Sequence, residues 1–309
     1  MMDITNELLK FVGCEYLATS KIVESGQRVV YLASNNNDPS AKFVLKTCPV
    51  YPSNVARIQR ELKILSEIDS KYFPKPLHSQ FITDEDLNYF VDNFDPKTQG
   101  EKINEVLSFN LRPFFVTVEE YIEHIPINDY IVRLKTEDTL IQYLLNVFEA
   151  LNLLWEKKIV HRDLKPDNIL VRSDLSPVVI DLGIAKSMRD GTQVITSPFS
   201  SSPCTPQFAS PEQLFNSKTE VTYKSDQFSI GILSYFILTG EFPFGTIQDI
   251  GIEDYMKSLV ANNIKKINDL NSNLSESLQT FVHKLLSPQP YKRFRNYQEI
   301  KNKLEEMRG

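Results

Sequence analysis

A polar run between two apolar segments contains the side chains that phosphoryl transfer needs. The run is His161-Arg162-Asp163-Leu164-Lys165-Pro166-Asp167-Asn168, and Asp181 ends the apolar segment Val178-Val179-Ile180 farther along. Phosphoryl transfer requires a carboxylate that accepts the hydroxyl proton, a cation near the moving phosphate, and oxygen ligands for magnesium. Asp163 fits the first role, Lys165 the second, and Asn168 and Asp181 the third.

Elements with a clear hydrophobic pattern flank this run on both sides. Before it, apolar residues from Leu140 to Trp155 follow one face of a long helix that begins near Glu137. After it, residues 226–239 are apolar on all sides, which predicts a buried helix ended by Gly240 and Pro243. Residues 15–50 instead read as three strands rich in β-branched and aromatic residues. The chain therefore combines a β-rich N-terminal part with a helical C-terminal part.

Composition excludes several other classes of protein. The chain has 309 residues, 41% of them hydrophobic and 24% charged, as in a water-soluble globular protein of one or two domains. Its net charge of −6 argues against a nucleic-acid partner. We find no apolar run of about 18 residues, hence no membrane span, and no signal peptide at the N-terminus. The three cysteines are too scattered for a disulfide framework or a zinc site, which favours the reducing cytoplasm.

The polar run and Asp181 together resemble the catalytic loop and the magnesium-binding motif of eukaryotic-type (Hanks-type) protein kinases. Lys165, two residues after the catalytic aspartate, and Thr205 in Thr205-Pro206 resemble the serine/threonine branch. The resemblance implies an α+β fold of two lobes, the smaller mostly antiparallel β with one key helix and the larger mainly helical. It also implies ATP and Mg²⁺ as cofactors, and proteins with Ser or Thr hydroxyls as substrates. The oligomeric state is left open.

The family pattern divides the chain into three parts. Residues 1–13 are an N-terminal extension, residues 14–122 the small lobe, and residues 123–309 the large lobe. Residues 83–112 form an insertion in the small lobe, where the family has a short hairpin. A binding site for a partner protein in this insertion is a guess.

In the small lobe, Lys46 resembles the strand lysine that holds the α- and β-phosphates of ATP. Val55, Ile58, Leu62 and Leu65 indicate an amphipathic helix that starts near Ser53 or Asn54. Glu61 on this helix matches the ion-pair partner of the lysine. Val30, Val44 and Leu170 are expected to enclose the adenine, and the segment from Glu120 to Ile122 resembles the hinge that hydrogen-bonds it.

The phosphate-binding loop and the gatekeeper position depart from the family pattern. When the chain is aligned on Val30, the three glycines of the phosphate-binding loop fall on Val23, Ser25 and Arg28. Glycines there let backbone amides approach the nucleotide phosphates, so Arg28 is expected either to crowd the phosphates or to supply charge. The same alignment puts Glu119 at the gatekeeper position, which is an unusual residue there.

In the large lobe, residues 184–209 resemble the activation segment, which ends in Ser210-Pro211-Glu212. Its candidate phosphorylation sites are Thr192, Thr196, Ser197, Ser200, Ser201 and Ser202, for which Arg162 would be the partner. Asp226 resembles the residue that accepts hydrogen bonds from the catalytic-loop backbone. Arg293 is expected to pair with Glu212, and residues 297–307 to form the closing helix.

Two alternatives to an ATP-dependent protein serine/threonine kinase are left open. One is a pseudokinase, a nucleotide- or partner-binding module, which the missing glycines favour. Against it, Lys46, Glu61, Asp163, Asn168 and Asp181 are all present. The other is a small-molecule kinase of the aminoglycoside or choline type, but such enzymes usually lack a lysine at the position of Lys165 and the Ser-Pro-Glu motif.

Overall fold

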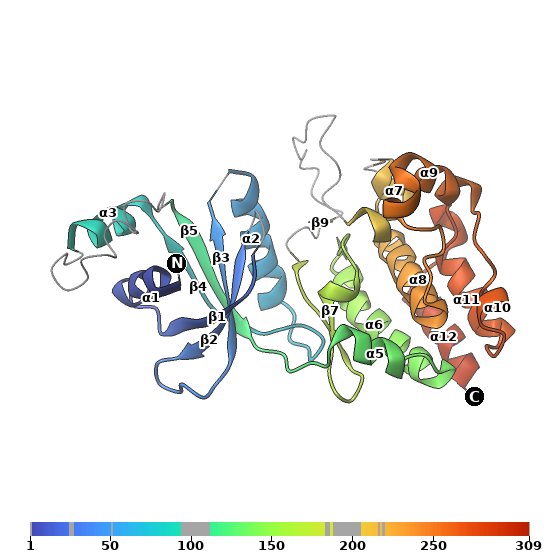
Figure 1. Cartoon of the computed structure of the whole chain (residues 1–309), viewed down its shortest axis with the longest axis horizontal. Coiled ribbons are helices and arrows are strands. Elements are labelled where there is room, and N and C mark those ends of the chain that lie inside the picture. The colour runs from blue at the N-terminus through green and yellow to red at the C-terminus, as the bar shows by residue number, and fades with distance from the viewer. Residues whose placement is uncertain are drawn as a thin grey trace. The chain divides into compact units, whose positions relative to one another are not determined.

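The computed structural model describes residues 2–24, 28–50, 52–93, 112–182, 186–187, 205–215, 217 and 220–308 (Figure 1). The chain divides into two compact units. Unit 1 contains residues 1–69 and 74–122, and unit 2 contains residues 70–73 and 123–309. Within the described residues, every helix is too short or too polar to cross a membrane.

Unit 1 is built on a five-stranded antiparallel sheet. Its strand order is β1-β2-β3-β5-β4, so the long connection before β5 puts that strand between β3 and β4. The described elements of the unit are α1 (Met2–Phe11), β1 (Tyr16–Glu24), β2 (Val29–Asn35), β3 (Phe43–Pro49), α2 (Pro52–Ser66), β4 (Pro76–Ile82), α3 (Asp84–Asn93) and β5 (Phe114–Glu120).

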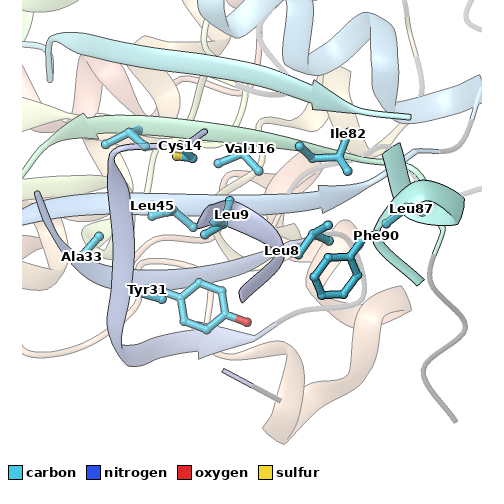
Figure 2. Packing of buried hydrophobic residues seen from close by; sticks show 12 residues of the cluster. Leu8, Leu9, Cys14, Tyr31, Ala33, Leu45, Ile82, Leu87, Phe90 and Val116 are labelled. Atoms are coloured by element: carbon cyan, nitrogen blue, oxygen red, sulfur yellow. The ribbon is translucent and has the colours of Figure 1, made fainter. Parts of the chain in front are cut away.

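Helices cover both sides of this sheet (Figure 1). On one side, Leu8 and Leu9 of α1 join a core cluster that also contains Leu45 and Val116 of the sheet and Phe90 of α3 (Figure 2). Helix α2 lies on the other side, where its Ile58 is 6% exposed. Because alternate residues of a strand point to opposite faces, Lys46 is directed away from the core cluster that contains Leu45.

The N-terminal helix is tied to the sheet by polar contacts as well. The Asn6 side chain donates to the carbonyl of Ala18 and accepts from the amide of Ala18, both at 2.8 Å. Ala18 borders an irregularity in the pairing of β1 with β2, where the ladder shifts register before Ser20. The Asn6 amide group therefore pairs with main-chain groups next to this break.

Unit 2 is mainly helical. The structure confirms the long helix with one apolar face, α6, and the buried helix, α8, that the sequence predicts, with N-caps at Thr136 and Thr222 and an αL residue, Gly240, at the end of α8. The helices are α5 (Ile127–Arg133), α6 (Glu137–Glu156), α7 (Pro211–Leu214), α8 (Tyr223–Thr239), α9 (Ile247–Ala261), α10 (Ile267–Leu270), α11 (Glu276–Leu285) and α12 (Tyr297–Arg308). The short elements are β6 (Ile159–Val160), η1 (Pro166–Asn168), β7 (Ile169–Val171), β8 (Pro177–Val179), β9 (Lys186–Ser187), η3 (Pro206–Phe208) and η4 (Pro290–Lys292).

Several expected boundaries were wrong by a few residues. Helix α2 begins at Pro52, because proline suits the first turn of a helix. The segment Phe73-Pro74-Lys75-Pro76-Leu77 also fits the start of a strand, but β4 begins only at Pro76, and Phe73 belongs to unit 2, where it is 2% exposed. Helix α8 begins at Tyr223, three residues before Asp226, because the side chain of Thr222 caps it. The first part of the insertion forms α3, and residues 94–111 lie outside the described residues.

Candidate active site

Unit 1 gathers four charged side chains on the sheet face that carries α2. Val44 pairs with Glu119, and Val30 pairs with Lys46. The side chains of Lys46 and Glu119 therefore point to the same face of adjacent strands as those of the two valines. The Lys46 ammonium lies 2.7 Å from the Glu119 carboxylate and 3.5 Å from the Glu61 carboxylate. Arg28 lies 3.6 Å from the other oxygen of Glu61. The predicted Lys46–Glu61 pair is therefore present, together with a second acid and a second base.

Burial and charge act in opposite directions on Lys46. Burial alone would lower the pKa of this lysine, but the carboxylates of Glu119 and Glu61 outweigh it and the pKa is raised. Lys46 is consequently a permanent cation at neutral pH. Val30 and Val44, the predicted adenine contacts, are half-buried on the same strands.

The predicted hinge follows β5. The main-chain N–H of Glu120 donates to Lys75 at 2.9 Å, and the Glu120 side chain accepts from the N–H of Lys75 at 3.3 Å. Ile122, the last residue of unit 1, is 4% exposed. The Glu120 N–H is therefore engaged within unit 1.

Unit 2 gathers the polar residues around Asp163. One carboxylate oxygen of Asp163 accepts from the Thr205 N–H at 2.8 Å, and the other accepts from the Asn168 side-chain amide at 3.1 Å. Lys165 lies 3.7 Å from Asp163 and donates to the Thr205 hydroxyl at 2.9 Å. Asp163, Lys165 and Asn168 are thus brought together, with Thr205 as a fourth member.

The two candidate metal ligands lie at one end of a hairpin. Strands β7 and β8 pair Ile169 with Val179, and the Ile180 N–H donates to the Asn168 carbonyl at 3.0 Å. Asn168 and Asp181 therefore sit next to the same pair of strand ends, and Asp181 has a left-handed φ of 61°. The Asn168 amide nitrogen is directed at Asp163, so its oxygen is the atom suited to a cation. Leu170, on β7, is half-buried opposite Val178.

A buried aspartate on α8 fixes the backbone of the polar run. Asp226 accepts from the N–H of His161 at 3.1 Å and from the N–H of Arg162 at 2.9 Å, which confirms the role predicted for it. Arg162 has a left-handed φ of 75°, a conformation that such hydrogen bonds stabilise. The Trp155 indole also donates to Asp226, at 3.0 Å. In the sequence, Trp155 is only one residue of an apolar helical face, which carries no signal for this bond.

A buried ion pair lies at the end of the predicted activation segment. Arg293 donates to the two carboxylate oxygens of Glu212 at 2.6 and 3.0 Å, as expected, and its guanidinium lies 4.8 Å from the ring centre of Phe228. Gln213 on α7 donates to the Arg162 carbonyl at 2.7 Å, which ties this anchor to the catalytic loop. The six candidate phosphorylation sites from Thr192 to Ser202 lie outside the described residues.

Comparison with known proteins identifies the family. Residues 25–304 match the protein kinase domain. The chain belongs to this family. The kinase domain is 32% identical over 164 residues to a probable serine/threonine-protein kinase of Clostridium perfringens, an alignment that covers 53% of this chain and 23% of that protein.

Other relatives are also named as kinases. The kinase domain is 28% identical over 202 residues to the probable serine/threonine-protein kinase PknB of Lactococcus lactis, covering 64% of this chain and 30% of that protein. It is 32% identical over 162 residues to the human hormonally up-regulated neu tumor-associated kinase, covering 52% of this chain and 22% of that protein. The alignments thus span less than a third of these relatives.

Proposed function

We propose that this chain is an ATP-dependent protein serine/threonine kinase. The main support is the cluster around Asp163, in which the carboxylate, the ammonium of Lys165 and the hydroxyl of Thr205 are joined by hydrogen bonds and an ion pair. Membership of the protein kinase domain family and the serine/threonine-kinase names of its relatives support the same function. We also propose that unit 1 is the small lobe and unit 2 the large lobe.

Each residue then has a role in one reaction. Asp163 accepts the proton of the substrate hydroxyl, since both its oxygens are already oriented by hydrogen bonds. Lys165 neutralises charge on the phosphoryl group as it moves. In unit 1, Lys46 holds the α- and β-phosphates, and Glu61 orients Lys46.

The nucleotide and metal fit the donors that the chain offers. The amide oxygen of Asn168 and the carboxylate of Asp181 are hard oxygen ligands of the kind Mg²⁺ prefers. Bound Mg²⁺ would offset the negative charge of the phosphates. The Glu120 carbonyl would accept from the exocyclic amine of adenine, and the Ile122 N–H would donate to the ring. Val30, Val44 and Leu170 would supply the apolar contacts to the base.

We further propose that the enzyme acts in the cytoplasm on protein substrates. Cys14 and Cys48 are buried free thiols, as is usual in a reducing compartment. Phosphate on the activation segment, paired with Arg162, would be its regulatory modification.

The test is phosphate transfer from labelled ATP in the presence of magnesium, to the protein itself or to a generic basic protein. Asp163→Ala is expected to reduce the rate about 100- to 10,000-fold while nucleotide binding persists. Lys10→Gln, on the surface of α1, is the matched control and is expected to leave the rate unchanged. If the wild type and Asp163→Ala both bind ATP and neither transfers phosphate, the chain is a pseudokinase. Transfer to an aminoglycoside or choline, and not to protein, would favour the small-molecule reading.

A further inference from the structure

Two carboxylates, those of Glu61 and Glu119, lie near the single ammonium of Lys46; together with Arg28 these side chains are called the Lys46 cluster. Glu119, at 2.7 Å, is a closer partner of the ammonium than Glu61, at 3.5 Å. The side chains of Lys46, Glu119 and Glu61 are 10%, 5% and 8% exposed, so water screens these charges little. These three described groups, one ammonium and two carboxylates, together carry a charge of −1.

Arg28 adds a second positive charge to these groups. Its guanidinium lies 3.6 Å from Glu61, on the oxygen that does not face Lys46, and its side chain is 19% exposed. Strand alternation explains the placement, since Arg28 lies two residues before Val30, and Val30 pairs with Lys46. With Arg28 included, these four described side chains carry two positive and two negative charges, which sum to zero.

The two residues that complete this cluster are also the two clearest departures from the family pattern. Arg28 occupies a position of the phosphate-binding loop that is otherwise glycine, and Glu119 occupies the gatekeeper position. We infer that Arg28 and Glu119 form a charge-matched pair that positions Lys46: Glu119 holds the ammonium, and Arg28 balances the carboxylate that Glu119 adds. The charge balance stands without nucleotide, whereas its effect on nucleotide binding rests on the proposed function.

This pairing has a consequence for nucleotide binding. Phosphate oxygens that approach Lys46 compete with the Glu119 carboxylate for the same ammonium. Removing the charge of Glu119 therefore favours the nucleotide, and removing the charge of Arg28 disfavours it. The sign for Arg28 decides between the two effects expected from the sequence, because a residue that only crowds the phosphates would give tighter binding when shortened.

A double-mutant cycle on thermal stability tests the charge balance. Glu119→Gln leaves the cluster with an extra positive charge and Arg28→Gln with an extra negative charge, so each is expected to lower Tm by about 3–8 °C in the absence of nucleotide. The double variant is neutral again and is expected to recover at least half of the summed loss. Glu7→Gln with Lys10→Gln, an exposed pair on α1, is the control and is expected to show coupling near zero.

Losses that simply add in the double variant would overturn the inference. If Glu119→Gln does not fold alone, recovery of folded protein on adding Arg28→Gln supports the pairing, and failure to recover contradicts it.

Binding of ATP with magnesium, measured by calorimetry, tests the positioning role. Glu119→Gln is expected to lower Kd about 3- to 10-fold and Arg28→Gln to raise it by a similar factor, while Arg28→Lys stays near the wild-type value. Shifts of the same sign in the two single variants would contradict the role. A wild type that binds no ATP, with intact coupling in Tm, would remove the proposed function and leave the charge pairing standing.

Discussion

Asp163 is held in one orientation by contacts to both of its carboxylate oxygens. The Thr205 N–H holds one oxygen, and the Asn168 amide holds the other. If Asp163 accepts the substrate proton as proposed, an orientation fixed in this way costs little free energy when the hydroxyl arrives. The Thr205 hydroxyl extends the arrangement to Lys165, so Thr205, which in the sequence only indicates the kinase branch, contacts both proposed catalytic side chains.

The Thr205 hydroxyl is therefore expected to matter for the rate. Thr205→Ala keeps the main-chain bond to Asp163 and removes the bond to Lys165, so we expect kcat to fall about 10-fold. Thr205→Ser retains the hydroxyl and should restore most of the rate. The measurement is steady-state phosphorylation of a basic protein at saturating ATP. Equal losses in both variants would show that the hydroxyl is not the important group.

The charge of Lys46 gives a prediction for alkaline pH. Its folded pKa is raised above the ordinary value of 10.5, chiefly because the carboxylates of Glu119 and Glu61 outweigh burial. For a raised basic group, the stability contribution is complete below the unfolded pKa and is lost as pH rises through the folded pKa. The Tm difference between wild type and Lys46→Met is thus expected to be constant from about pH 7 to about pH 10 and to shrink above that. A difference that shrinks below about pH 9 would contradict the assignment.

A buried carboxylate on helix α8 accepts hydrogen bonds from the backbone of the polar run at residues 161–168. Asp226 is fully buried, and burial raises its pKa while the N–H groups of Trp155, His161 and Arg162 act against burial. Removing one donor leaves the carboxylate less well satisfied in a place that water does not reach. The position of α8 and the conformation of the loop are therefore energetically linked.

Trp155→Phe is expected to destabilise the protein by about 1–3 kcal/mol, because it removes the indole N–H and keeps most of the aromatic volume. Chemical denaturation with urea measures this loss. Phe148→Leu, on the same helix but without a hydrogen bond to lose, is the comparison for a change in packing alone. A loss below about 0.5 kcal/mol would mean that the Trp155 bond contributes little.

Helix α1 offers a matching test in unit 1. Asn6→Ala removes two hydrogen bonds to Ala18, and we expect a loss of about 1–2 kcal/mol, measured by urea denaturation. Asn6→Asp keeps one hydrogen-bond acceptor, so its free energy of unfolding should lie between those of the wild type and of Asn6→Ala. A fully stable Asn6→Ala variant would show that Leu8 and Leu9 alone hold the helix.

Elements with strong periodic patterns can be predicted from the sequence. Contacts between residues that are far apart in the sequence are harder to predict. The apolar face of α6 and the all-round apolar character of α8 followed from residue patterns, and the pairing of Glu212 with Arg293 followed from the resemblance to protein kinases. The bonds of Asn6 and Trp155 did not, because one polar atom on an otherwise apolar face leaves no periodic signal. Glu119 and Arg28 were recognised as departures from a pattern, but their connection through Lys46 and Glu61 depends on strand pairing across 73 residues.

At the scale of the whole molecule, a short segment of unit 2 interrupts the sequence of unit 1. Residues 70–73 belong to unit 2, where the Tyr72 hydroxyl bonds to Asn146 and Glu149 and its carbonyl accepts from Val179. Phe73 adds a side chain that is 2% exposed. The boundary at residues 122 and 123 is therefore not a clean division of the fold.

A protease site inserted between Ile122 and Glu123 is expected to yield two fragments that stay together after cleavage, because the first fragment carries residues 70–73. Size-exclusion chromatography measures the association. Tyr72→Ala with Phe73→Ala should promote separation, since it removes the hydrogen bonds and the buried ring. Fragments of the unmutated protein that separate at micromolar concentration would contradict this expectation.

The ion pair of Glu212 with Arg293 also affects the order of events during synthesis. The two residues are 81 positions apart, and Arg293 is the later of the two to be synthesised. Until Arg293 leaves the ribosome, the carboxylate of Glu212 lacks this partner, and burying it early would be costly. The polar run at residues 161–168, tied to α7 through Gln213, thus reaches its final form only after Arg293 has been synthesised. A nascent chain released before that point would lack this anchor.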